Sequence, residues 1–115
     1  MSELSKKSCE ACRADAPKVT KEEIAQYAPS IPKWDILEEA GIAKLKRAYS
    51  FSKYADTLAL VNAIAAIADE ENHHPDMFFE YKTLTVFWWS HKIKGLHIND
   101  FICAAKCDSI SEAMN

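Results

Sequence analysis

The feature that most constrains the fold is a long apolar segment that ends abruptly. Residues 53–72 carry apolar side chains at helical spacing, and Pro75 stops the segment because proline cannot continue a helix. We therefore predict a helix from about Lys53 to Asn72, with Ser52 as its N-cap.

The apolar side chains of this helix form two stripes, although a single buried face needs only one. The first stripe contains Phe51, Tyr54, Ala55, Leu58, Val61, Ala65 and Ala68, and the second contains Leu60, Ile64 and Ile67. We assign the first stripe to the protein's own sheet and the second to a partner subunit. The sequence therefore predicts a homo-oligomer, either a dimer or a tetramer.

Shorter elements surround this helix. Thr20 and Glu23 have the spacing of a capping box, which predicts a helix that ends near residue 28. Residues 34–39 and 44–51 are predicted strands, residues 77–90 form one long strand or two, and residues 99–107 form a last helix. The order αββαββα predicts an α+β fold, in which a four-stranded antiparallel sheet carries three helices on one face.

Length and composition limit the possible classes of protein. At 115 residues we expect a flexible arm over residues 1–18 and a single domain over residues 19–115. No apolar run reaches the ~20 residues of a membrane span, and residues 1–10 lack the apolar core of a secretory signal, so we predict a cytoplasmic protein. The net charge of -3, without a basic stripe on any predicted helix, argues against direct binding to nucleic acid.

Two histidines at the end of the long helix are the candidate site. The negative end of the helix dipole favours a protonated imidazole at His73 and His74. Asp69 and Glu70 precede them by four residues, so each carboxylate is predicted to pair with the histidine that follows it. This arrangement suits acid–base chemistry. A metal site that includes Asp76 and a purely structural capping role are the alternatives.

Cysteines and one arginine leave further alternatives open. Cys9 and Cys12 could form a redox pair or, together with Cys103 and Cys107, a four-thiolate zinc site, and free thiols are the other interpretation. Arg47 falls on the apolar side of its predicted strand. Either its stem packs while its guanidinium reaches water, or it anchors a ligand or a carboxylate.

The run from residue 69 to residue 100 resembles the signature of the pterin-4a-carbinolamine dehydratases. The matching residues are Asp69, His73-His74-Pro75, Tyr81, His91 and Asp100. Further similarity covers about residues 9–108 and includes Trp34, the strand with Arg47, Gly95-Leu96 and Ala104-Ala105. His97 differs, because a threonine usually caps the last helix of the family, and this puts that cap in doubt. Phe87 and Trp89 also place unusual apolar bulk on one face of the sheet.

The resemblance implies an enzyme that removes water from 4a-hydroxytetrahydrobiopterin to give quinonoid dihydropterin, in the recycling of tetrahydrobiopterin for aromatic amino acid hydroxylation. It implies that His73 and His91 form the acid–base pair and that His74 orients the pterin, with the division of labour among them left open. Asp69, Asp100 and Pro75 would contact the substrate or support the histidines. No metal and no cofactor are expected. The alternative is a protein-binding module, since some family members act as dimerisation cofactors of transcription factors.

Overall fold

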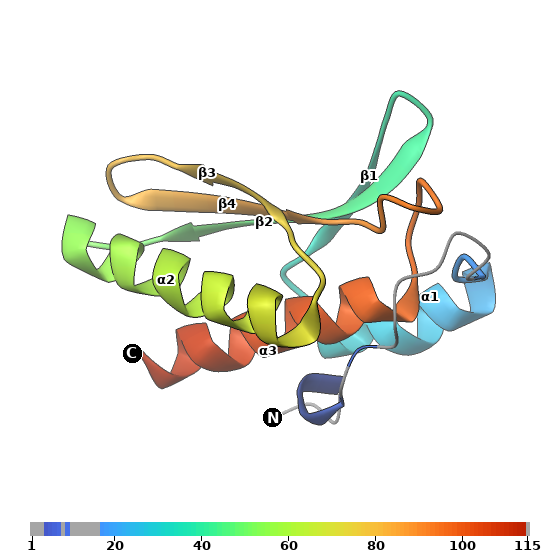
Figure 1. The fold of residues 1–115 in the computed structure, drawn as a ribbon, viewed down its shortest axis with the longest axis horizontal. Coiled ribbons are helices and arrows are strands. Elements are labelled where there is room, and N and C mark those ends of the chain that lie inside the picture. The colour runs from blue at the N-terminus through green and yellow to red at the C-terminus, as the bar shows by residue number, and fades with distance from the viewer. Residues whose placement is uncertain (1–3, 8, 10–16, 115) are drawn as a thin grey trace.

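A four-stranded antiparallel sheet organises the computed structural model, which describes residues 4–7, 9 and 17–114. The strands are β1 (Asp35–Glu39), β2 (Ile42–Ser50), β3 (Asp76–Phe79) and β4 (Thr83–Trp88), and they lie side by side in the order β1-β2-β4-β3. The helices are α1 (Lys21–Tyr27), α2 (Tyr54–Glu71) and α3 (Ile98–Ala113), with short 3-10 turns at Leu4–Lys6 and Ala28–Ser30. Figure 1 shows all three α-helices on one face of the sheet. The predicted fold class and element order are confirmed.

Local signals explain most of the element boundaries. The Thr20 hydroxyl accepts from the Glu23 N–H, and the Glu23 carboxylate accepts from the Thr20 N–H, so the predicted capping box is present. Residues 77–90 contain two strands, because the chain turns between β3 and β4. The tight turn before β2 places Ala40 and Gly41 at positive φ, as two-residue hairpin loops require.

Two predicted boundaries are wrong. Lys53, in an extended conformation and without a side-chain cap bond, is the N-cap of α2, so Ser52 does not have that role. The last helix continues to Ala113 rather than ending near Cys107. Its final turns still pack, since Ser111 is buried, and such tertiary packing extends a helix beyond its strongest apolar pattern.

The two apolar stripes of α2 do not divide as predicted, because the second faces the core and the first is split, with Ala68 buried. Leu60 and Ile64, from the second stripe, are fully buried under the protein's own sheet, whereas Tyr54 and Leu58, from the first, are exposed. Helical periodicity gives the angle between side chains but not which stripe faces inward. The prediction that the second stripe faces a partner subunit is therefore wrong, and the large exposed apolar side chains of α2 lie on the first stripe.

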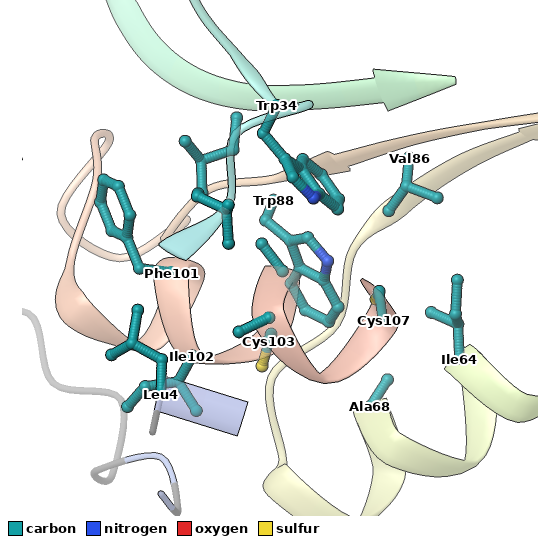
Figure 2. Packing of buried hydrophobic residues seen from close by; sticks show 14 of the residues in the cluster. Leu4, Trp34, Ile64, Ala68, Val86, Trp88, Phe101, Ile102, Cys103 and Cys107 are labelled. Carbon is teal, nitrogen blue, oxygen red and sulfur yellow. The ribbon is translucent and has the colours of Figure 1, made fainter. Parts of the chain in front are cut away.

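The core fills the space between the sheet and the helices. Leu84, Val86 and Trp88 point inward from β4 and are completely buried, as the alternation along this strand predicts. Figure 2 shows Trp88 near the centre of the cluster, close to Cys103 and Cys107 of α3. Leu4, from the segment predicted to be an arm, is buried beside Ile102. None of the helices in the described residues is long and apolar enough to cross a membrane.

Candidate functional site

The end of α2 separates the two adjacent histidines. Asn72 adopts the left-handed conformation (φ 52°, ψ 41°), and its N–H bonds the carbonyls of Ala68 and Asp69. The chain therefore leaves the helix one residue before His73. His73 turns inward and is buried, while His74 remains exposed.

His73 contacts a carboxylate from a distant part of the chain. Its Nε2 lies 2.6 Å from Oδ1 of Asp100, and the imidazole stacks on the indole of Trp88 with ring centroids 5.3 Å apart. The side chain of His73 is 4% exposed and that of Asp100 is 0% exposed, so water is nearly excluded from this pair. An ionised carboxylate can only accept, so Asp100 holds the His73 tautomer that carries its proton on Nε2.

Asp100 is itself held by the start of α3. The Ser90 hydroxyl and the His97 N–H both donate to Oδ2, each at 2.9 Å. Asp100 is the third residue of α3, where the positive end of the helix dipole also stabilises its charge. With Nε2–H of His73, the buried carboxylate has three donors.

His97 caps α3 in place of the expected threonine. Its Nδ1 accepts from the Asn99 N–H at 3.1 Å, and Asp100 completes the capping box. An imidazole nitrogen provides the acceptor that a hydroxyl would otherwise provide. The structure therefore contains the helix cap that the absence of the threonine had put in doubt.

The predicted carboxylate partners of the histidines are wrong. His73 pairs with Asp100 rather than Asp69, and Asp69 instead pairs with His74, Nε2 to Oδ1, at 3.1 Å. Spacing of four residues brings side chains together only while the helix continues, and α2 ends at Glu71. The Asp69–His74 pair is solvent-exposed, so the interaction is weak.

His91 lies on the exposed side of this corner. Its ring stacks on Trp89 with centroids 3.8 Å apart, and the Trp89 indole N–H donates to Asp76 Oδ2 at 3.0 Å. Asp76 begins β3, directly after His74 and Pro75. The Trp89–Asp76 bond therefore ties the segment that carries His91 to the segment that carries His74.

Together these contacts make a site with two parts. The buried part is an imidazole–carboxylate pair, His73 and Asp100, and the exposed part contains His74 and His91 at the sheet end. Such an arrangement can hold one proton in a fixed place and exchange another with water. Within residues 4–7, 9 and 17–114, no group of three or more histidine, cysteine or acidic side chains is placed to hold a metal ion. Cys12 lies outside the described residues, so the four-thiolate prediction is untested.

Sequence reasoning missed Ser90, which belongs to the buried part. The inward alternation of Leu84, Val86 and Trp88 continues to residue 90, and this signal predicts that its side chain faces the core. A polar side chain on an inward position needs a partner, and Asp100 is that partner.

A second carboxylate on α3 binds Arg47. Asp108 accepts from the Arg47 guanidinium, from the Tyr49 hydroxyl at 2.6 Å, and from the Trp34 indole N–H. Burial is the main cause that raises the pKa of Tyr49, with the charges of Cys107 and Asp108 next, so its hydroxyl stays protonated and continues to donate. Of the two interpretations of Arg47, anchoring of a carboxylate is the one that holds.

Comparison with known proteins points to one family. The family model described as "Pterin 4 alpha carbinolamine dehydratase" matches residues 17–110. A curated protein of Nitrosococcus oceani, named "Putative pterin-4-alpha-carbinolamine dehydratase", is 48% identical over 110 residues, which cover 96% of this chain and 97% of that protein.

Two solved structures share the fold at 21% identity. The transcriptional coactivator/pterin dehydratase from Brucella melitensis matches with a TM-score of 0.74 and covers 82% of this chain and 98% of its own. A pterin dehydratase-like protein identified as a RuBisCO assembly factor in the alpha-carboxysome matches with a TM-score of 0.60, over 69% and 89%. Because the family model spans most of the chain and the curated relative aligns along nearly its whole length, this chain belongs to the pterin 4 alpha carbinolamine dehydratase family.

Proposed function

We propose that the protein is a hydro-lyase that converts 4a-hydroxytetrahydrobiopterin to quinonoid dihydropterin and water. The observation that carries this proposal is the buried His73–Asp100 pair beside two exposed imidazoles. The reaction needs a group that removes the proton of the ring N–H next to carbon 4a and a group that protonates the departing hydroxyl. It involves no change of oxidation state at the protein, so imidazoles alone can perform it.

His73 is the proposed base. Asp100 binds Nε2–H, and this carboxylate stabilises the imidazolium that forms when His73 takes the proton of the substrate. Trp88 fixes the plane of the imidazole by stacking on it. A base held in this way loses little freedom when it takes the proton, which lowers the barrier of the step.

His91 is the proposed acid, and His74 orients the pterin. His91 is exposed, so it recovers its proton from water after each turnover. Its ring is held flat on Trp89, which gives it a defined direction despite that exposure. Asp69 orients His74, and Pro75 keeps His74 in an extended conformation at the start of β3.

A dehydration assay tests this assignment. Chemically formed 4a-hydroxytetrahydropterin is mixed with wild type, His73→Ala or His91→Ala, and formation of the quinonoid product is followed by absorbance. We expect wild type to accelerate dehydration and each substitution to lower kcat by about 100-fold or more. Circular dichroism checks that each variant is folded. Wild type that leaves the uncatalysed rate unchanged would rule out the enzyme.

A cytoplasmic homo-oligomer is the proposed setting, in which the enzyme recycles the cofactor of aromatic amino acid hydroxylases without a metal or cofactor of its own. The support for self-association is the exposed stripe of α2, where Tyr54 is 51% exposed and Leu58 is 39% exposed. Burying such apolar area favours association. Leu58→Glu should shift the protein to a smaller species in sedimentation analysis, whereas Ala59→Glu, at an exposed position that points about 100° away on the same helix, should not.

A second candidate function is a protein-binding, coactivator-type role. The observation that favours it is an aromatic patch in which the ring of Tyr54 stacks on Phe79 with centroids 5.2 Å apart and lies 6.1 Å from the ring of Tyr81, which is 68% exposed. Exposed aromatic side chains are common in protein interfaces. Binding to a partner that Tyr81→Ser abolishes and His73→Ala preserves would favour this role over catalysis.

A further inference from the structure

Two cysteines that are far apart in the sequence lie in contact. The Sγ atoms of Cys9 and Cys103 are 3.4 Å apart, although 94 positions separate the residues. Both are free thiols, Cys103 fully buried and Cys9 partly exposed. The sequence spacing pairs Cys9 with Cys12, but the neighbour that the structure places beside Cys9 is Cys103 of α3.

Several bonds hold Cys9 in this position. Its backbone N–H donates to Glu71 Oε1 at 2.7 Å, at the last residue of α2. The Cys9 thiol also lies 3.8 Å from the Asn99 carbonyl oxygen on α3. Its backbone and its thiol are thus held by different helices, which directs the thiol toward Cys103.

The segment before Cys9 is attached to α3 as well. Lys106 donates to the Ser5 carbonyl at 3.0 Å, and its ammonium lies 4.0 Å from the Glu71 carboxylate. Leu4 is 5% exposed against the same helix. The contact between the two thiols is therefore part of a packed junction between the N-terminal segment and α3. A bond between the two sulfur atoms needs no large displacement of the chain.

We propose that Cys9 and Cys103 are a redox-modification site, in which a low-molecular-weight disulfide such as oxidised glutathione converts the two thiols to a reversible disulfide. The Cys9 thiolate attacks one sulfur of oxidised glutathione, and one glutathione leaves. The Cys103 thiolate then attacks Cys9 of this mixed disulfide, and the second glutathione leaves. Two electrons pass from the protein thiols to oxidised glutathione, and the two thiol protons end on the two reduced glutathiones.

The order of the two attacks follows from the surroundings of each sulfur. The hydrogen bond with Cys9 and burial both raise the pKa of the Cys103 thiol, so Cys103 stays protonated in the first step, and it can give up its proton after Cys9 has become a mixed disulfide and this hydrogen bond is lost. Cys9 is the partly exposed member, so reagents in water reach it first. Cys107 is 0% exposed and burial raises the pKa of its thiol to about 12, so reagents in water do not reach it, and the thiol in contact with Cys9 is that of Cys103.

The closed disulfide would cross-link the N-terminal segment to α3 one turn after Asp100. This site does not depend on the proposed dehydratase activity, because it rests on the thiols alone. It gives the chain a covalent state that can be reached in an oxidising environment and reversed by excess thiol.

Peptide mapping of the full chain tests the proposal. Wild-type protein is equilibrated with oxidised glutathione, the remaining thiols are alkylated under denaturing conditions, and the digest is analysed by mass spectrometry. We expect a Cys9–Cys103 linked peptide as the main oxidised species, with a decrease from four alkylated cysteines to two. The same linked peptide should form in Cys12→Ser and in Cys107→Ser. It should be absent from Cys9→Ser.

A thermal scan provides a second measurement. Oxidised wild type and oxidised Cys12→Ser should both melt at a higher temperature than their reduced forms, because a long loop is closed. Oxidised and reduced Cys9→Ser should melt together. Three results would overturn the proposal, namely a Cys9–Cys12 linkage in wild type, a mixed glutathione disulfide at Cys9 that never resolves, or oxidation that leaves all four thiols free.

Discussion

Asp100 and Asp108 lie on the same helix, about two turns apart, and each carboxylate has at least three donors, although Asp100 is buried and Asp108 only partly so. Asp100 accepts from an imidazole, a hydroxyl and a backbone N–H. Asp108 accepts from a guanidinium, a phenol and an indole. The difference is in the principal partner: an imidazole nitrogen can donate or accept a proton, whereas a guanidinium only donates hydrogen bonds.

This comparison separates a carboxylate with a structural role from one that supports the proposed base, His73. The Asp108 cluster ties α3 to β2 and to the residue before β1, and its guanidinium is a hydrogen-bond donor only. The Asp100 cluster ties α3 to the end of α2 and the end of β4, and it contains an imidazole, which can donate or accept a proton. Two carboxylates with a similar number of hydrogen-bond donors can therefore have different roles. The role depends on whether one of the donors can also exchange a proton.

Asp100→Asn should produce the largest effect, and it should appear in turnover. The amide keeps the shape of the side chain but cannot stabilise the imidazolium of His73, so we expect kcat to fall by about 100-fold or more. KM should change little, since Asp100 is 0% exposed and we expect it to act through His73. Steady-state dehydration kinetics at a temperature well below the melting point measures both values. Unchanged kcat would mean that His73 does not act as the base.

Asp108→Asn is the matched variant, and its effect should appear in stability. It leaves Arg47 without its anionic partner in a mostly buried position, with 17% of the arginine side chain exposed. Breaking such a pair should lower the free energy of unfolding by about 3 kcal/mol. Urea denaturation measures this loss, and kcat of the folded variant should stay within about threefold of wild type. If kcat of the folded variant instead falls by much more than threefold, the distinction between the two clusters is lost.

The sequence predicts the fold well because the fold depends on local patterns. Alternation in residues 84–88, the Thr20–Glu23 spacing and the proline after α2 each act over a few residues. It singles out His73 and His74 as candidates from the helix end alone, and His91 only through resemblance to a family. The partners of those histidines were mispredicted because Asn72 takes a left-handed conformation, which no periodicity rule anticipates. The contact of Asp100 with Ser90 and His73 depends on how three elements meet in space.

Ser90→Ala should have a smaller effect that sharpens the assignment of the Asp100 cluster. The substitution removes one of three donors to a buried carboxylate, which costs about 1.5 to 3 kcal/mol. Part of this cost lowers the free energy of unfolding, and part raises the activation free energy of the reaction. We expect kcat to fall about tenfold. Ser90→Thr retains a hydroxyl and should restore most of the activity, which a simple packing role would not require. Equal activities for the alanine and threonine variants would remove Ser90 from the site.

His97→Ala should have the smallest effect, because it removes a helix cap while the backbone donor to Asp100 remains. The Asn99 N–H loses its Nδ1 acceptor, and a lost cap lowers the free energy of unfolding by about 1 kcal/mol. His97→Thr should recover this loss in urea denaturation, since a hydroxyl can accept the same bond. Thr20→Ala, at the exposed cap of α1, should cost a similar amount without any change in kcat. If His97→Ala instead lowers kcat as strongly as Ser90→Ala does, then the capping imidazole supports catalysis directly, and the buried part of the site extends to the first turn of α3.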